Sequence, residues 1–307
     1  MSTALSTSST APAPPSSSLD ALSRHSRGRA VKDVAARVLV TLAFVVAVVP
    51  LAWILWTVAS RGWHLLLDQH WWLNSQRGIT ARVQGGGAYH AIVGTVLEGA
   101  VTALISVPIA IMTAVYLVEY GRGRLARAVS FMVDILTGIP SIVAALFIYA
   151  LWVTTLGFDR VAFAVSLSLV LLMVPVVVRS TEEMLKLVPN ELREASYALG
   201  VPKWRTVVKV VLPTAFSGIM TGILLGLARV MGETAPLLIL GPYSKSINTD
   251  LFNGFMAALP TMINQDRTEL LAPAVERVWA TALTLVLLIL VLNLAGRLVA
   301  RLGSVKK

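Results

Sequence analysis

The sequence predicts an all-α polytopic membrane protein with six transmembrane helices. Of its 307 residues, 56% are hydrophobic and only 14% are charged, and the mean hydropathy is +0.75. Soluble domains are nearer to about a quarter charged. Six apolar stretches are long enough to cross a bilayer, since a crossing helix needs roughly 20 residues. These observations exclude an ordinary soluble domain.

The six predicted spans are residues 34–59, 91–118, 129–153, 161–178, 214–240 and 278–299. Pro108, Pro140 and Pro175 each lie inside a predicted span. A proline removes a backbone donor, which implies a kink or locally freed carbonyl groups. The loop at 60–90 carries Trp63, Trp71 and Trp72, which we expect at the membrane–water interface.

The ends of the chain differ in composition from the spans. Residues 1–33 are rich in Ser, Ala and Pro, so we expect a disordered tail. The apolar run after this tail exceeds the roughly 7–15 residues of a signal peptide, which favours an uncleaved anchor. We therefore expect a tail at 1–33, a six-helix membrane domain at 34–302 and a basic tail at 303–307.

The basic residues indicate the orientation of the chain. Six spans place both termini on one side, together with the connections at 119–127 and 179–209, and most of the 26 Lys and Arg residues lie there. The positive-inside rule makes that side cytoplasmic. This asymmetry accounts for the net charge of +10, so lipid is an expected neighbour and nucleic acid is not. We expect a multi-pass protein of the cell membrane with both termini in the cytoplasm.

The connection before the fifth span is predicted to form a helical hairpin at 190–210. Its helix-compatible, charged sequence is interrupted once, at Gly200-Val201-Pro202. Gly ends a helix at low cost because it accepts a left-handed backbone, and Pro suits the first turn of the next helix. We expect two short helices around a tight turn, followed by a span that begins near Pro213. An ordered cytoplasmic loop of this kind is typical of a contact site for another protein.

The predicted fifth span contains Arg229 and Glu233, and a charge inside a bilayer costs at least about 2–3 kcal/mol. Gly218, Gly222 and Gly226 recur along the same helix. On one continuous helix all five residues fall within about 80° of one another. Small residues allow close helix approach, so this face is expected to point toward a partner helix or a pathway. Two interpretations stay open: an internal Arg–Glu pair that holds the bundle together, or a cation lining a route for an anion.

Three further charged residues lie in or near the spans. Arg179 ends the fourth span, where an arginine reaching to the interface is the simpler interpretation. Asp134 is interpreted as a helix-end carboxylate near the cytoplasmic face. Glu98, in the second span, stays ambiguous.

The sequence contains no credible set of catalytic residues. It has no Cys, and its four His residues lie in loops or tails without metal-site spacing. A phosphate-binding loop of the G-x-x-x-x-G-K type is also missing. We therefore expect a non-enzymatic chain without metal or bound cofactor. If ATP drives it, a separate subunit must hydrolyse the ATP.

The hairpin resembles the cytoplasmic loop of ABC importer permeases, whose pattern is E-A-A-x-x-x-G, nine residues, then I-x-L-P. The matching residues here are Glu194, Ala195, Ser196, Gly200, Val210, Leu212 and Pro213. Ser196 replaces the second Ala and Val210 replaces the Ile, but the spacing is intact. The resemblance implies a type I importer permease of MetI-like architecture. It also implies that the hairpin is a pair of coupling helices that contacts a cytoplasmic ATPase through Glu194, Ala195, Gly200 and Trp204.

Other motifs resemble the phosphate-specific permeases, and the PstA-type subunit more than the PstC-type. They are Ala228-Arg229 with Gly232-Glu233-Thr234-Ala235-Pro236, Gly138-Ile139-Pro140-Ser141, Val178-Arg179-Ser180-Thr181-Glu182-Glu183 and Ala198-Leu199-Gly200. The resemblance implies an ATP-driven phosphate importer with a PstC-type partner subunit, two copies of a PstB-type ATPase that holds ATP and Mg, and a PstS-type binding protein. It also implies that Arg229, Glu233 and Arg179 lie on the substrate pathway.

Three alternatives remain from the sequence. The first is a permease for another oxyanion such as sulfate or molybdate. The second is a membrane scaffold or signalling subunit that reports phosphate status. A secondary transporter is the weakest alternative, because such folds often contain inverted repeats and none is convincing here.

Overall fold

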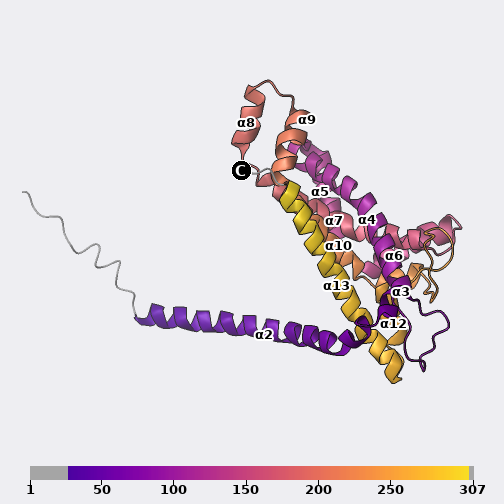
Figure 1. Cartoon of the computed structure of the whole chain (residues 1–307). Coiled ribbons are helices and arrows are strands. Elements are labelled where there is room, and N and C mark those ends of the chain that lie inside the picture. The colour runs from indigo at the N-terminus through magenta and orange to yellow at the C-terminus, as the bar shows by residue number, and fades with distance from the viewer. Residues whose placement is uncertain (1–26, 304–307) are drawn as a thin grey trace, which may run out of the picture. The chain divides into compact units, whose positions relative to one another are not determined.

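The computed structural model of this chain describes residues 27–303, so most of the predicted N-terminal tail and the end of the basic C-terminal tail lie outside the described residues. All regular structure within residues 27–303 is helical (Figure 1). The chain divides into two units, residues 1–57 and 58–307. The described part of the first unit belongs to α2, Arg27–Leu66, a helix of 40 residues. This helix begins before the predicted start of the first span and extends beyond its predicted end.

The second unit consists of the end of α2 and the remaining helices and short π-helical segments. These elements are α3 (Gln69–Leu73), α4 (Tyr89–Val115), η1 (Tyr116–Tyr120), α5 (Gly123–Gly138), α6 (Ser141–Ile148), η2 (Tyr149–Thr155), α7 (Ala162–Lys186), α8 (Asn190–Ala198), α9 (Lys203–Thr206), η3 (Val207–Val211), α10 (Leu212–Met231), α11 (Ala235–Leu240), α12 (Leu259–Asp266) and α13 (Ala272–Gly303).

Five helices of the described chain are long and apolar enough to cross a membrane, and a bent pair raises the number to six. That pair is α5 with α6 and η2, and its two parts meet at an angle of 107°. The prediction of one helix over 129–153 was therefore wrong. Pro140 offers no backbone donor and biases Ile139 toward extended backbone, so the helix ends before it.

The predicted fifth span is also interrupted. Helix α10 ends at Met231, and α11 begins only at Ala235, after three residues outside any helix. The single helix predicted over 214–240 was wrong, because Gly232 closes α10 and Pro236 suits the first turn of α11. The fourth span is longer than predicted, because α7 continues past Val178 to Lys186.

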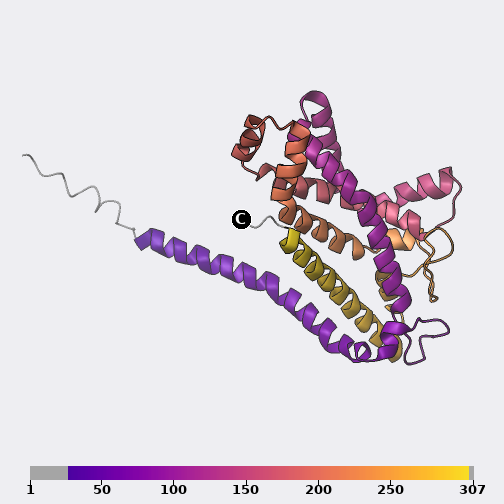
Figure 2. The ribbon, with the colours of Figure 1, turned by 45° about the horizontal axis from the view of Figure 1, so that its top comes forward.

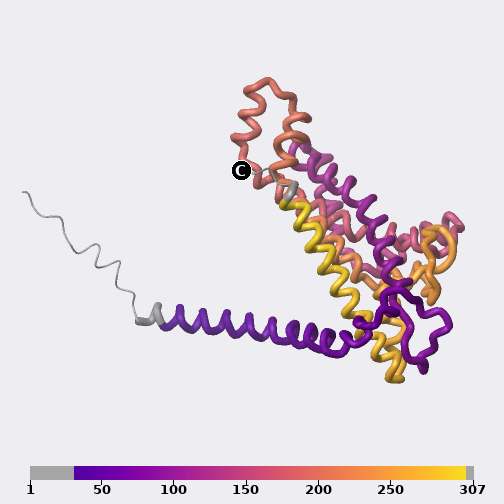
Figure 3. Tube along the Cα trace, in the orientation of Figure 1, coloured from indigo at the N-terminus to yellow at the C-terminus, as the bar shows by residue number. Residues whose placement is uncertain are grey.

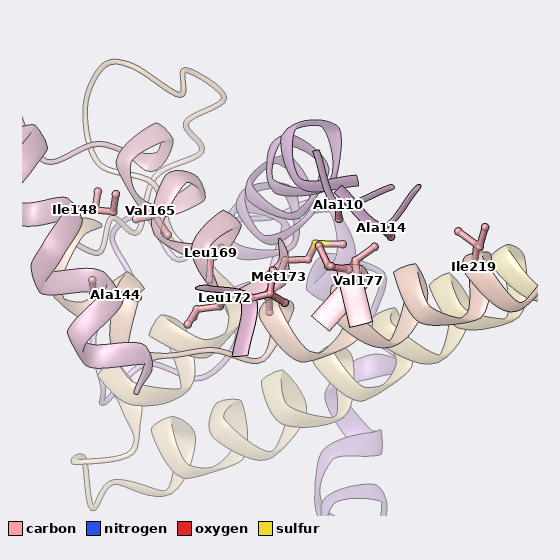
Figure 4. Packing of buried hydrophobic residues seen from close by; sticks show 14 of the residues in the cluster. Ala110, Ala114, Ala144, Ile148, Val165, Leu169, Leu172, Met173, Val177 and Ile219 are labelled. Atoms are coloured by element: carbon pink, nitrogen blue, oxygen red, sulfur yellow. The ribbon is translucent and has the colours of Figure 1, made fainter. Parts of the chain in front are cut away.

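The core lies along α7, which packs against α4, α6 and α10. In Figure 4, Ala110 and Ala114 of α4 lie close to Met173 and Val177 of α7. The glycine face of α10 packs on α7, as expected for a face of small residues. A Cβ on Gly218, Gly222 or Gly226 would meet Met184, Ser180 or Val177 respectively.

The α8–α9 hairpin and the short helices α3 and α12 lie at opposite ends of the second unit (Figure 1). The α8–α9 hairpin and the C-terminal end of α13 lie at one end, whereas α3 and α12 lie at the other, as the ribbon views and the tube show (Figures 1, 2 and 3). Trp71 of α3 is fully buried, and its Nε1 donates a hydrogen bond to Thr284 Oγ1 at 2.9 Å. Trp71 therefore packs inside the protein.

A buried polar cluster holds the loops at the α3–α12 end. Arg277 pairs with Asp266, with Nε 3.2 Å from Oδ2, and it donates to the carbonyl oxygens of Thr80 and Val83. Gln76 joins the same carboxylate to the hydroxyl of Tyr243. Burial raises the pKa of the Tyr243 phenol far above its ordinary value, so Tyr243 remains a neutral donor.

Candidate functional site

The turn between α8 and α9 is closed by a Schellman motif. Gly200 has a φ of +73°, and its N–H donates to Tyr197 O at 2.9 Å. The N–H of Val201 donates to Ser196 O at 3.2 Å. This 6→1 and 5→2 pattern is the one in which a Gly in the left-handed region ends a helix. The predicted helix–turn–helix hairpin is confirmed.

The two arms of the hairpin are joined by side chains. The Ser196 and Thr206 hydroxyl groups lie 2.8 Å apart, and both residues are buried. Ser196 is the residue that departs from the E-A-A pattern, and its hydroxyl gives Thr206 a partner that an Ala would lack. Val207 and Val211 of η3 are buried and continue the second arm into α10.

A buried ion pair anchors the hairpin to the membrane helices. Arg193 of α8 donates from Nε and Nη2 to Glu119 Oε1 of η1 at 3.1 and 2.9 Å, and their side chains are only 12% and 5% exposed. The same guanidinium donates to Val188 O at 2.6 Å and Leu185 O at 2.9 Å, where α7 ends. Lys203 of α9 donates to the backbone oxygen of Glu119. The sequence alone did not indicate this anchor. The two partners are 74 residues apart, and Glu119 lies in a predicted connection between spans.

The residues predicted to contact a partner all lie on the exposed surface of the hairpin. Glu194, Ala195, Gly200 and Trp204 are exposed. Leu199 at the tip is 83% exposed and Trp204 is 58% exposed. Large apolar side chains this exposed at the tip of an anchored hairpin are typical of a protein contact surface.

Helix α10 carries an exposed stripe that is mainly polar. Residues along this stripe recur every three or four positions: Thr214, Ser217, Thr221, Leu225 and Arg229. The stripe lies beside the glycine face that packs on α7. An arginine on an uncovered face of a membrane helix is costly in lipid, so protein or water must cover this face.

Arg229 and Glu233 do not form the internal pair that helical spacing suggested. Between residues 27 and 303 no ion pair joins them, because α10 ends at Met231 and Glu233 lies in the break before α11. Arg229 is exposed and Glu233 is partly buried. The structure therefore leaves the Arg229 guanidinium available on the exposed stripe.

Arg179 lies in a separate ion network that joins α5 to α7. Its guanidinium contacts Asp134 Oδ1 and Glu182 Oε2, both at 2.5 Å, and donates to the backbone oxygen of Ser130 at 2.9 Å. Glu182 also accepts from Lys186 at 2.7 Å. Arg179 is therefore an ion-paired residue, and α7 continues for two turns past it.

The ambiguous carboxyl group of the second span, Glu98, is buried in α4. It is 3% exposed, and its Oε1 has no hydrogen-bond partner among the described residues. Its backbone oxygen accepts from Thr102 Oγ1 at 2.7 Å, so only the side chain is unsatisfied. In the part of the chain that the structure describes, no cluster of three His, Asp or Glu side chains has the arrangement of a metal site.

Comparison with known proteins identifies the family. Residues 106–302 match the family described as "Binding-protein-dependent transport system inner membrane component". "Phosphate transport system permease protein PstA 1" of Mycobacterium tuberculosis (strain CDC 1551 / Oshkosh) is 54% identical over 88% of this chain and 89% of the relative. The PstA of Mycobacterium leprae (strain TN) is 53% identical over 87% and 88%. The PstA of Pasteurella multocida (strain Pm70) is 39% identical over 81% and 87%.

The chain belongs to the PstA family of transport permeases. The PstA-family hairpin, α10 and the α5–α7 network all lie within the matched residues. Solved structures agree with the ABC permease fold. A bacterial alginate ABC transporter chain aligns with a TM-score of 0.58 at 16% identity, over 89% of this chain and 98% of the other. A chain of the MetNI methionine ABC transporter aligns with a TM-score of 0.55 at 21% identity, over 71% and 94%.

Membership in the PstA family makes this chain a multi-pass inner-membrane component of an ABC transport system. The predicted MetI-like, all-α architecture is confirmed. A permease of this family depends on a binding protein, as the family's description says.

Proposed function

We propose that this chain is the permease subunit of an ATP-driven importer that moves inorganic phosphate into the cytoplasm by alternating access. The observation that carries the proposal is Arg229, an uncovered guanidinium on the exposed polar stripe of a membrane helix. A guanidinium offers planar donors and a fixed charge that suit phosphate. The PstA names of the relatives support phosphate over sulfate or molybdate as the substrate.

The stripe supports the assembly that we propose. A PstC-type subunit would cover the polar face of α10, and phosphate would move between the two subunits past Arg229. Glu233, in the three-residue break after α10, is four residues from Arg229 in sequence and would limit how tightly the anion is held. A pathway site must bind well enough to admit the anion and weakly enough to release it.

The hairpin supports a mechanical connection to a PstB-type ATPase, two copies of which would supply ATP hydrolysis. Its exposed tip would contact the ATPase. The rest of the hairpin is attached to the membrane helices at three points. One is covalent, through η3 into α10, and the others are the Arg193 contacts with Glu119 and with the end of α7. A displacement of the tip would therefore move the ends of α4, α7 and α10 together.

Orientation follows from the same proposal. The hairpin and both termini would lie in the cytoplasm, in agreement with the positive-inside rule. The loops held by the Arg277–Asp266 pair lie at the other end of the second unit and would face a PstS-type phosphate-binding protein outside the membrane. Arg179 is held by Asp134 and Glu182, so we assign it to the pathway only in a state in which α5 and α7 separate.

Substitution of Arg229 tests the proposal. In cells or proteoliposomes containing the whole transporter, we expect Arg229→Gln to reduce uptake of radiolabelled phosphate at least tenfold while the subunits still co-purify. Arg229→Lys keeps the charge but loses the planar donors, so intermediate uptake is expected. Unlabelled sulfate and molybdate should compete poorly with phosphate in the parent protein.

Two results would contradict the proposal. Normal uptake by Arg229→Gln would remove this residue from the pathway. Strong competition by sulfate or molybdate would assign the permease to another oxyanion. Intact uptake together with an altered phosphate response of the cell would instead indicate a signalling role.

A further inference from the structure

A basic cavity lies at the base of the hairpin, away from the exposed stripe of α10. Its volume is about 420 Å³, and it is bounded by η1, the start of α5, the end of α7 and the α8–α9 hairpin. The charged residues that line it are Glu119, Arg122, Lys186, Arg193 and Lys203. None of these residues belongs to the proposed transport pathway.

The cavity has an excess of positive charge. Its one carboxylate, Glu119, is already bound by Arg193. Lys203 donates to a backbone oxygen and lies 5.0 Å from the centre of the Tyr120 ring, so no carboxylate neutralises it within the described residues. Arg122 is exposed and has no ion-pair or hydrogen-bond partner among residues 27–303. Lys186 shares Glu182 with Arg179.

The donors around this space suit a phosphate group. Arg122 supplies a planar guanidinium, and Lys186 and Lys203 supply ammonium groups, which are the side chains that bind phosphate in proteins. Tyr197 and Asn190 add neutral polar groups to the wall. The volume lies in the range of about 300–1,000 Å³ that is typical of small-molecule sites, so the cavity admits a phosphate with its hydration or a larger phosphate ester.

We propose that this cavity is a second anion site, which binds a phosphate group beside the coupling hairpin. The group belongs either to inorganic phosphate or to the headgroup of an anionic lipid. A bound phosphate would bridge Arg122 at the start of α5, Lys186 at the end of α7 and Lys203 of α9. The site would therefore hold the hairpin in one position relative to the membrane helices. The proposal rests on the proposed function only in assigning the cavity to the cytoplasmic side.

Hydrogen exchange of the whole complex tests this site without measuring transport. The full-length chain, with the subunits that co-purify, is placed in nanodiscs of phosphatidylcholine, and exchange is followed in peptides from 116–124 and 190–206. Millimolar inorganic phosphate, or phosphatidylglycerol in the disc, is compared with chloride at equal ionic strength. We expect at least threefold slower exchange with one of the two. Phosphate alone would identify the free anion as the ligand, and phosphatidylglycerol alone would identify the lipid headgroup.

A matched pair of variants makes the test specific. The double variant Arg122→Gln/Lys186→Gln removes two exposed charges of the cavity and is expected to abolish the slowing. Arg124→Gln removes an exposed charge that is two residues away and does not line the cavity, so the slowing should persist. The proposal is wrong if neither phosphate nor phosphatidylglycerol slows exchange, or if the double variant responds like Arg124→Gln. Either result is independent of the uptake measured for Arg229 variants.

Discussion

Gly200 ends α8 because its φ of +73° lies in the region that residues with a Cβ rarely adopt. No heavy atom lies within 4 Å of the place that a Cβ would take, so packing does not require a Gly here. The backbone conformation alone requires it. The hairpin turn is therefore a property of one residue and its two neighbours.

Replacing Gly200 should loosen the turn. We expect Gly200→Ala to cost about 1–2 kcal/mol, the usual penalty for a left-handed L-residue. Hydrogen exchange of the backbone amides in residues 190–206 should be faster than in the parent protein, and less ATPase should co-purify. Gly157→Ala is the matched control, because Gly157 has the same φ of +73° and equally open surroundings but lies far from the hairpin in sequence. If both variants retained the ATPase equally, the hairpin turn would not matter for coupling.

Trp71 and Trp72 show how neighbouring identical residues take different roles. Trp71 is fully buried and hydrogen-bonded to Thr284, whereas Trp72 is 40% exposed. We expect Trp71→Ala to lower the free energy of unfolding by about 3–5 kcal/mol, through the cavity that it leaves. Trp72→Ala should change it by about 0.5 kcal/mol. Thermal unfolding in detergent measures both, and similar losses from the two variants would contradict this assignment.

At the scale of elements, the contact between α7 and α10 depends on glycine. A Cβ on Gly222 would lie 2.0 Å from Ser180 Oγ and 2.6 Å from its Cβ, which no rotamer change of so short a side chain relieves. Helices α7 and α10 must therefore move apart if a larger residue replaces Gly222. Because α10 also carries Arg229, a shift of α10 would move the exposed stripe.

A compensating pair tests this contact. We expect Gly222→Ala to destabilise the protein by about 1–3 kcal/mol through overpacking. Adding Ser180→Gly should restore much of that loss, because it removes the atoms that clash. Gly138→Ala serves as the control, since it lies in a helix with nothing within 4 Å of the new Cβ and should be tolerated. Failure of Ser180→Gly to restore the melting temperature would argue against direct contact as the cause.

At the scale of the second unit, one buried pair joins the hairpin to the helices. Arg193 and Glu119 connect α8 to η1, which continues α4, and the carbonyl groups at the end of α7 complete the guanidinium's contacts. Leaving such a charge without its partner is strongly destabilising, whereas an exposed pair contributes little. The pair therefore strengthens the connection that makes the hairpin and the helices move together.

Removing the carboxylate should uncouple them. We expect Glu119→Gln to destabilise the protein by about 3 kcal/mol and to reduce phosphate uptake more than it reduces ATP hydrolysis. Lys186→Gln breaks only an ion pair whose lysine is largely exposed, so at most about 1 kcal/mol is expected. The measurements are thermal unfolding and the ratio of phosphate moved to ATP hydrolysed. An unchanged ratio in Glu119→Gln would show that force does not pass through this pair.

The all-helical membrane class and the hairpin with its turn at Gly200 follow from the amino-acid sequence alone. The sequence also identified the charged residues of the fifth span. These features depend on local properties: the length of an apolar run and the backbone freedom of one glycine. The breaks before Pro140 and after Met231 also have local causes, in Gly and Pro residues that an average hydropathy does not register. The burial of Trp71 and the Arg193–Glu119 anchor are visible only in the tertiary structure. They depend on which distant segments pack together, and neither hydropathy nor helical spacing contains that information.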